Sequence, residues 1–94
     1  MARTNNIPVT LIEKSARAET AFDNLGFGEV FSDHMLLCDW ADGGWKSPRI
    51  VPREALKVDP AALGLHYGQS VFEGLKAYRG IADNRIRLFR PERN

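Results

Sequence analysis

The sequence predicts an α+β fold, in which a small mixed or antiparallel sheet of hairpins is combined with one or two helices. Two stretches alternate in side-chain character around turn signals, which is typical of hairpins. A third stretch, residues 60–74, spaces its apolar residues as a short amphipathic helix does. With 94 residues, of which 44% are hydrophobic, the chain is long enough for one small domain with a modest core.

The first 25 residues are predicted to be an N-terminal arm. Residues 7–12 read as a short extended segment, and Pro8 makes this segment an edge or a lead-in rather than a central strand. Residues 13–22 are rich in alanine and mixed in charge, which fits either a helical turn or two or a mobile arm. Residues 24–28 form a loop because of their glycines. The remaining residues, 26–94, are predicted to make up the domain.

Residues 34–41 form the first predicted strand. Because both of its alternating faces carry apolar side chains, we expect this strand to be central in the sheet. Asp42, Gly43 and Gly44 make a turn signal, and residues 45–51 form the return strand, bent at Pro48.

A helix is predicted to start near Pro60, since proline suits the first turn of a helix. Gly68 in its middle costs roughly 1 kcal/mol relative to alanine, so either the backbone needs a close approach there or the helix is simply short. Gly74 is expected to end the helix as a left-handed residue. The apolar stripe that faces inward consists of Leu63, Leu65, Tyr67, Val71 and Phe72.

A second hairpin follows, with strands at residues 75–79 and 85–89 and a turn at residues 80–84. Pro91 ends its second strand. Together these strands and helices form a layer that can bury one face.

Composition argues against several classes of partner. The formal net charge of +1 provides no global attraction to nucleic acid or to membranes. Cys38 is the only cysteine, so an intrachain disulfide is impossible and a reducing compartment is expected. No apolar run approaches a membrane span, and residues 1–6 lack the apolar core of a secretory signal. The predicted location is therefore the cytoplasm.

Few residues carry recognisable chemistry by themselves. Cys38, His34 and His66 are too few and too scattered for a metal site. We expect Cys38 to be a buried strand cysteine and His34 a structural histidine at a strand start. His66 is expected near the helix start, bonded to backbone. Glu73 opposes the helix dipole at the helix end, so it is expected to have a specific partner.

A basic cluster near the end of the chain admits two interpretations. With Phe89 among them, these arginines resemble a nucleic-acid surface, but a solvated strand face explains them better. The net charge is near zero and Glu92 interrupts the cluster, which consists of Arg85, Arg87, Arg90 and Arg93.

Several motifs resemble the branched-chain amino-acid aminotransferases, which are fold-type IV enzymes that use pyridoxal 5'-phosphate. The resemblance covers roughly residues 26–94, and several motifs in family order are a strong signal. The central motif is His66-Tyr67-Gly68 followed by Ser70-Val71-Phe72-Glu73-Gly74. The others are Gly26-Phe27-Gly28, Phe31-Ser32-Asp33-His34-Met35-Leu36 with Trp40, Gly44-Trp45, Pro48-Arg49-Ile50 and Arg87-Leu88-Phe89-Arg90-Pro91.

The resemblance implies that the chain is the N-terminal, small-domain portion of such an enzyme. In the family a lysine holds the cofactor, which acts as an electron sink for the carbanion formed at the substrate. That lysine, a phosphate-binding arginine and a glutamate on the pyridine nitrogen all lie beyond the position of Asn94. Lys14, Lys46, Lys57 and Lys76 do not match the family lysine. The resemblance therefore implies that these 94 residues do not include the catalytic lysine. It also implies that they cannot bind the cofactor by themselves.

What the resemblance assigns to this chain is a hydrophobic substrate pocket. Phe27, Tyr67 and Phe72 match the family aromatics that line the cavity for a branched side chain, and Gly74 matches a backbone position beside it. Plain packing in a core is the alternative role for these aromatics.

The function implied is transfer of the amino group of Leu, Ile or Val to 2-oxoglutarate, within a cytoplasmic homodimer that binds neither nucleic acid nor membrane. Another fold-type IV enzyme is the alternative, either a D-amino-acid aminotransferase or an aminodeoxychorismate lyase. A small nucleic-acid-binding module is the third hypothesis.

Overall fold

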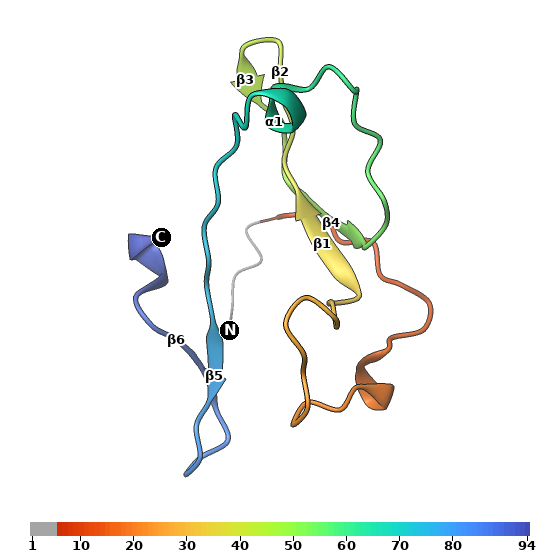
Figure 1. The fold of residues 1–94 in the computed structure, drawn as a ribbon. Helices are drawn as coiled ribbons and strands as arrows, with labels where there is room; N and C mark the ends of the chain where they lie inside the picture. The colour runs from red at the N-terminus through yellow and green to blue at the C-terminus, as the bar shows by residue number, and fades with distance from the viewer. Residues whose placement is uncertain (1–5) are drawn as a thin grey trace. The chain divides into compact units, whose positions relative to one another are not determined.

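The computed structural model describes residues 6–94. The chain divides into two compact units, the first ending at Leu56 and the second running from Lys57 to Asn94. Each unit consists of short hairpins and single helical turns joined by irregular segments (Figure 1). The predicted combination of small antiparallel hairpins with helix is confirmed, although within the described residues the hairpins form three separate two-stranded sheets and the α-helix has only four residues.

The first unit is built on the antiparallel pair of β1 (His34–Leu37) and β4 (Arg49–Pro52). Leu36 lies opposite Ile50 in this pair. On the other edge of β4, Val9 forms an isolated parallel bridge to Ile50. Strand β4 thus has partners on both edges at this point.

The extended segment before residue 12 is an edge, as Pro8 predicts. Ile50 N–H donates to Pro8 O at 2.9 Å, and Thr10 N–H donates to Ile50 O at 2.9 Å. Proline has no N–H to donate, so only its carbonyl takes part. Further along the arm a single 3₁₀ turn, η1 (Arg17–Glu19), forms within the stretch predicted to contain a helical turn or two.

The first hairpin closes through β2 (Trp40–Ala41) and β3 (Gly44–Trp45). Asp42 and Gly43 between them have φ angles of 51° and 74°, the two positive values that a type I′ turn requires. The Trp40 and Trp45 rings meet edge to face, with centroids 5.2 Å apart and planes at 80°. Such a pair contributes about 0.5–1.5 kcal/mol beyond its buried area. The predicted turn is therefore confirmed.

The long strands predicted on either side of this turn are interrupted. Pro48 lies between β3 and β4 and cannot donate to the ladder. Across the interruption Lys46 N–H donates to Asp39 O at 2.8 Å, and Arg49 pairs with the Asp39 carboxylate at 2.7 Å. These polar contacts bridge the gap between the β1–β4 pair and the β2–β3 pair.

The expectation that the first strand is central in a sheet is wrong for the part of the chain that the structure describes. Strand β1 pairs only with β4 there, and Leu36 is 58% exposed. Two apolar faces predict a strand that is covered on both sides. Residues 6–94 supply no layer that buries either face.

The second unit begins with a much shorter helix than predicted. Helix α1 (Leu63–His66) has a single turn, and Gly68 takes a φ of 60° directly after the C-cap residue Tyr67. Glycine reaches this left-handed conformation without the strain that a Cβ would impose, so it ends the helix. The prediction that Gly74 ends the helix is wrong, because Gly68 already does so.

The second hairpin forms as predicted, from β5 (Ala77–Arg79) and β6 (Ile86–Leu88). Its strands are antiparallel, with Tyr78 opposite Arg87. Its loop closes through Gly80 N–H, which donates to the carbonyl of residue 85 at 2.8 Å. A final 3₁₀ turn, η2 (Pro91–Arg93), follows β6.

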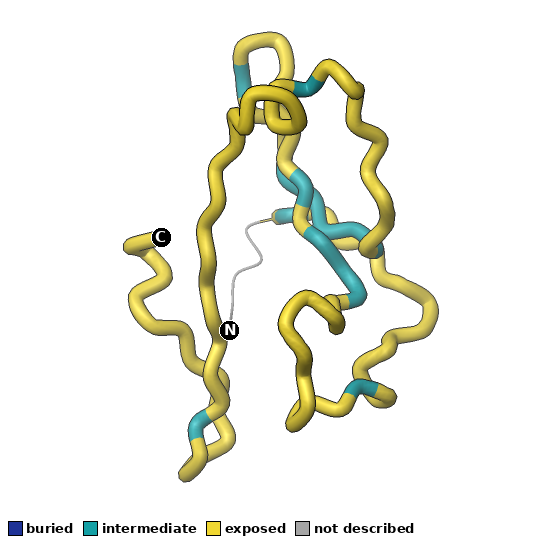
Figure 2. The backbone as a smooth tube through the Cα atoms, in the orientation of Figure 1, coloured by how far each residue is buried: buried dark blue, intermediate teal, exposed yellow. Residues whose placement is uncertain are grey.

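Burial is slight throughout the described residues. Among residues 6–94 no residue is buried, and the half-buried ones concentrate on β1 and β4 (Figure 2). The expected layer with one buried face is therefore not formed, since hairpins this short leave both faces open. In the same range no helix has the length and apolar character needed to cross a membrane.

Candidate functional site

Three of the predicted site residues lie in the second unit, on and just after α1. Tyr67 is the C-cap residue of α1, and its side chain is 85% exposed. Phe72 and Gly74 lie in the irregular segment that leads to β5, and Phe72 is 93% exposed. The segment thus presents aromatic side chains outward.

The structure brings Phe72 and Gly74 together. The ring of Phe72 lies 3.9 Å from the position that a Cβ on Gly74 would take. A side chain at residue 74 would touch the ring at ordinary contact distance. The small residue therefore leaves the space beside the phenyl ring unfilled.

Hydrogen bonds hold the backbone at this point. Gly74 N–H donates to Glu73 Oε1 at 2.8 Å. The side-chain amide of Asn94 donates to Glu73 Oε1 at 2.9 Å and to Gly74 O at 2.7 Å. The prediction that Glu73 has a specific partner is confirmed, but the reason given for it is wrong. Helix α1 ends at His66, so no helix dipole acts on Glu73.

Phe27 lies in the first unit, in the irregular segment between η1 and β1. Its ring is fully exposed, and the next residue, Gly28, has a φ of 70°. Gly28 meets no atom within 4 Å of an added Cβ, so backbone conformation alone explains the glycine. The pocket role of Phe27 stays a prediction, as do those of the other three residues.

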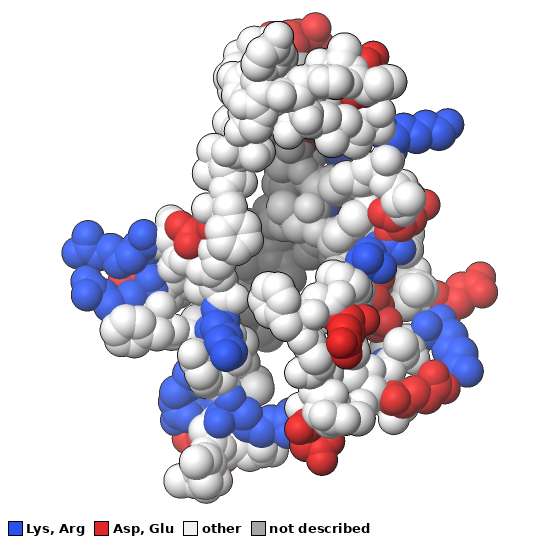
Figure 3. Space-filling view, in the orientation of Figure 1, with Lys and Arg blue, Asp and Glu red and all other residues white. Residues whose placement is uncertain are grey.

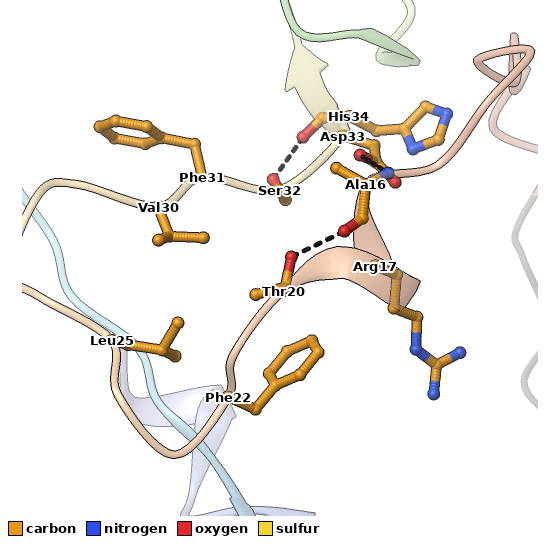
Figure 4. A pocket seen from close by; sticks show the side chains of 10 residues that line it. All are labelled: Ala16, Arg17, Thr20, Phe22, Leu25, Val30, Phe31, Ser32, Asp33 and His34. Atoms are coloured by element: carbon orange, nitrogen blue, oxygen red, sulfur yellow. Dashed lines mark hydrogen bonds between the residues drawn. The ribbon is translucent and has the colours of Figure 1, made fainter.

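The sequence patterns did not indicate a cavity that the first unit contains between its arm and the start of β1 (Figure 4). Its volume is about 420 Å³. Its apolar wall comes from loop residues without regular spacing, which is why no periodicity revealed it. The lining residues are Ala16, Arg17, Thr20, Phe22, Leu25, Val30, Phe31, Ser32, Asp33 and His34.

Asp33 joins the arm to this cavity. Ser15 Oγ donates to one carboxylate oxygen at 2.5 Å, and Ala16 N–H donates to the other at 3.0 Å. The hydrogen bond from Ser15 and then that from Ala16 lower the pKa of the Asp33 carboxyl below its ordinary value. The carboxylate therefore fastens the arm in its ionised form.

A second ionic contact shapes the β5–β6 loop. Both guanidinium nitrogens of Arg87 donate to the Asp83 carboxylate, one of them at 2.9 Å. This pairing lowers the pKa of Asp83 and raises that of Arg87. Figure 3 shows Lys and Arg side chains gathered over this hairpin and the C-terminal turn.

The histidines behave as structural residues, as predicted. Ile12 N–H donates to Nε2 of His34 at 3.0 Å, at the start of β1. Nε2 of His66 lies 2.5 Å from Pro60 O, to which it donates. His66 is the last residue of α1, not near its start, because the helix is short.

Cys38 is not buried. It lies between β1 and β2, is exposed, and donates from Sγ to Lys46 O at 3.2 Å. The prediction of a buried strand cysteine is wrong because no layer covers this strand. Within residues 6–94 no group of three or more His, Cys, Asp or Glu side chains is placed to hold a metal ion.

Residues 6–94 do not form a site for the cofactor that the resemblance implies. All the lysines are exposed. Lys14 pairs with Glu19 at 3.4 Å, Lys46 pairs with Asp42 at 3.5 Å, and Lys76 lies over the Tyr78 ring. None of these lysines lines the cavity of the first unit. We therefore assign no cofactor ligand to the described residues.

Comparison with known proteins finds that the chain is similar to branched-chain-amino-acid aminotransferases. "Branched-chain-amino-acid aminotransferase 2" of Bacillus subtilis is 56% identical over 73 residues, which are 77% of this chain and 20% of that protein. The cytosolic branched-chain-amino-acid aminotransferase of Caenorhabditis elegans is 55% identical over 71 residues, 74% of this chain and 17% of the relative. That of Mus musculus is 53% identical over 73 residues, 77% of this chain and 19% of the relative.

The chain is thus homologous to the branched-chain-amino-acid aminotransferases, and the resemblance that its motifs show is confirmed. It spans about a fifth of the length of these relatives. No protein-family model matches the chain.

Proposed function

We propose that this chain is the N-terminal, small-domain portion of a fold-type IV transaminase that depends on pyridoxal 5'-phosphate. The enzyme would transfer the amino group of Leu, Ile or Val to 2-oxoglutarate. The observation that supports the proposal is the identity of 53–56% to curated branched-chain aminotransferases over about three quarters of the chain.

In this proposal the chain supplies the apolar wall of the substrate pocket. Phe27, Tyr67 and Phe72 contact the branched side chain, and Gly74 leaves space beside it. Full burial of a Val, Leu or Ile side chain is worth about 1.5–3 kcal/mol. An apolar wall also disfavours charged side chains, which lose their hydration there. The outward exposure of Tyr67 and Phe72 leaves both aromatic rings free to contact a substrate.

Tyr67 has a second proposed role. Glutamate has to enter the same pocket in the second half-reaction, and the Tyr67 hydroxyl is a donor that its carboxylate can use. Tyr67→Phe should therefore slow turnover of glutamate more than that of leucine. Unchanged turnover of both substrates would remove this role.

The remaining machinery is assigned to residues outside this chain. The 94-residue chain alone should show no transaminase activity, because none of its lysines matches the position of the family lysine. By resemblance we infer a homodimer in the cytoplasm that binds neither nucleic acid nor membrane. Two of the relatives carry the word cytosolic in their names.

A hybrid enzyme tests the proposal. Residues 26–94 replace the homologous segment of the Bacillus subtilis relative, and transfer from leucine to 2-oxoglutarate is measured. We expect activity within about tenfold of the unmodified relative, since volume-conserving differences at a mainly apolar surface cost less than about 1.5 kcal/mol. A folded, cofactor-loaded hybrid without activity on leucine would contradict the proposal.

The same hybrid distinguishes the second fold-type IV hypothesis. A D-amino-acid aminotransferase pocket would raise activity on D-alanine relative to leucine. The names of the relatives favour leucine as the better substrate.

A further inference from the structure

The side chain of Asn94 joins two parts of the second unit that lie 20 residues apart in sequence. Its Nδ2 group donates to Glu73 Oε1 at 2.9 Å and to Gly74 O at 2.7 Å. One side-chain amide thus holds both a side chain and a backbone carbonyl of the same short segment. Only an amide or a cation can donate two such bonds from one side chain, and an aspartate in its place can donate none.

The segment that receives these bonds has little other support. Residues 69–76 belong to neither a helix nor a strand, so no ladder fixes their backbone. Gly74 N–H donates only locally, to the preceding Glu73 side chain at 2.8 Å. Among residues 6–94, the bonds from Asn94 are the ones that reach Glu73 and Gly74 from a distant part of the chain.

The held segment is also the one that carries predicted pocket residues. Gly74 lies beside the Phe72 ring, and a Cβ added to Gly74 would be 3.9 Å from the nearest ring carbons. Fixing the Gly74 carbonyl and the Glu73 carboxylate therefore limits the directions in which the neighbouring Phe72 ring can point. Pre-ordering a pocket wall in this way lowers the entropy cost of binding.

We infer that Asn94 is a positioning residue for the Phe72–Gly74 wall of the substrate pocket. The effect on catalysis rests on the proposed function. The claim that Asn94 fixes the segment rests only on its hydrogen bonds to Glu73 and Gly74. Asn94 touches no reacting group and acts through Glu73 and Gly74.

The structural claim is tested by NMR on the folded hybrid enzyme, with glutamate and glycine selectively labelled and with Asn94→Asp as the variant. Aspartate keeps the shape of asparagine but removes both donors and faces the Glu73 carboxylate with a like charge. We expect the amide signals of Glu73 and Gly74 to shift, and the order of both residues to fall. The signal of Gly80, in the β5–β6 loop, should stay in place.

Arg93→Ala is the matched control, because Arg93 is the neighbouring residue on η2 and has no part in these bonds. It should leave the signals of Glu73 and Gly74 unchanged. Equal effects of the two variants, or no effect of Asn94→Asp, would overturn the inference.

The catalytic consequence is tested in the hybrid enzyme. Asn94→Asp should raise the KM for leucine about two- to tenfold, the loss expected from one net hydrogen bond, with a smaller change in kcat. A variant that only lowers the yield of folded enzyme would leave KM unchanged, and this result would contradict a positioning role. If the hybrid with Asn94 intact is inactive, the proposed function fails, while the NMR result still decides whether Asn94 holds the segment.

Discussion

At the scale of single residues, polar side chains of this chain hold loops to strands through hydrogen bonds to backbone. Asp33 accepts from the Ser15 hydroxyl and the Ala16 N–H, and His34 accepts from Ile12 N–H. These contacts fasten the arm to the start of β1. They make the position of the arm depend on the charge of one carboxyl group.

The first prediction concerns pH. Because the folded-state pKa of Asp33 lies below its ordinary value, ionised Asp33 stabilises the docked arm at neutral pH. This stabilisation is lost as the pH falls through the lowered pKa. The amide signal of Ala16 should therefore titrate in the acid range, and Asp33→Asn should abolish that titration.

Asp83→Asn serves as the control, since Asp83 lies in the β5–β6 loop with its pKa lowered by Arg87. It should leave the Ala16 titration intact. An Ala16 signal that responds to Asp83→Asn and not to Asp33→Asn would contradict the assignment.

Residue roles that depend on nearby residues in the sequence could be predicted. Roles that depend on burial by other parts of the protein could not. The structural roles of His34 and His66 followed from their places beside backbone turns. Burial of Cys38 required a covering layer, which a strand pattern cannot guarantee. The two hydrogen bonds from the Asn94 side chain reach Glu73 and Gly74, which lie 21 and 20 residues earlier in the sequence. Local residue spacing gives no indication of such long-range contacts.

At the scale of elements, turn chemistry was the most informative feature of the sequence. The Asp42-Gly43 turn formed where predicted, because a type I′ turn needs residues that tolerate positive φ. The second hairpin also formed where predicted. The helix was predicted too long. Apolar spacing continues through Phe72, but it carries no information about the backbone angle of Gly68.

The second prediction tests the role of Gly68. An added Cβ at Gly68 meets no atom within 4 Å, so Gly68→Ala acts through the left-handed backbone alone. That conformation costs about 1–2 kcal/mol for an L-residue. We expect faster hydrogen exchange at the amides of Tyr67 and Gln69, both of which donate to Leu63 O.

Gly64→Ala is the contrasting variant within the same turn. Its Cβ would meet Gln69 O at 3.7 Å, an ordinary contact. Because alanine favours the helix by about 1 kcal/mol over glycine, exchange at Tyr67 should slow. If both variants speed exchange equally, Gly68 is not the residue that ends α1.

At the scale of the whole molecule, the described chain consists of hairpins and turns without a buried core. Its relatives are about four times as long. The apolar side chains on both faces of β1 and along residues 63–72 predict covering layers. The described residues provide no such layer. This is why the sequence predicted a layer that buries one face, and why the structure shows none.

The third prediction follows from this exposure. Exposed apolar side chains such as Val71 and Ile81 should bind the dye ANS, and heating should produce no sharp cooperative transition. Calorimetry and dye fluorescence of the 94-residue chain measure both properties. A sharp heat-absorption peak without dye binding would contradict the description of an open chain.

The central claim is that this chain forms the apolar wall of a substrate pocket, and Phe72→Ala in the hybrid enzyme tests it most directly. The measurement is kcat/KM for leucine and for alanine. The methyl group of alanine is too small to make much contact with the pocket wall. Phe89→Ala, an exposed aromatic substitution outside the proposed pocket, is the control. We predict a roughly ten- to hundredfold loss for leucine with little change for alanine. Equal losses for both substrates, or no loss for leucine, would contradict the account.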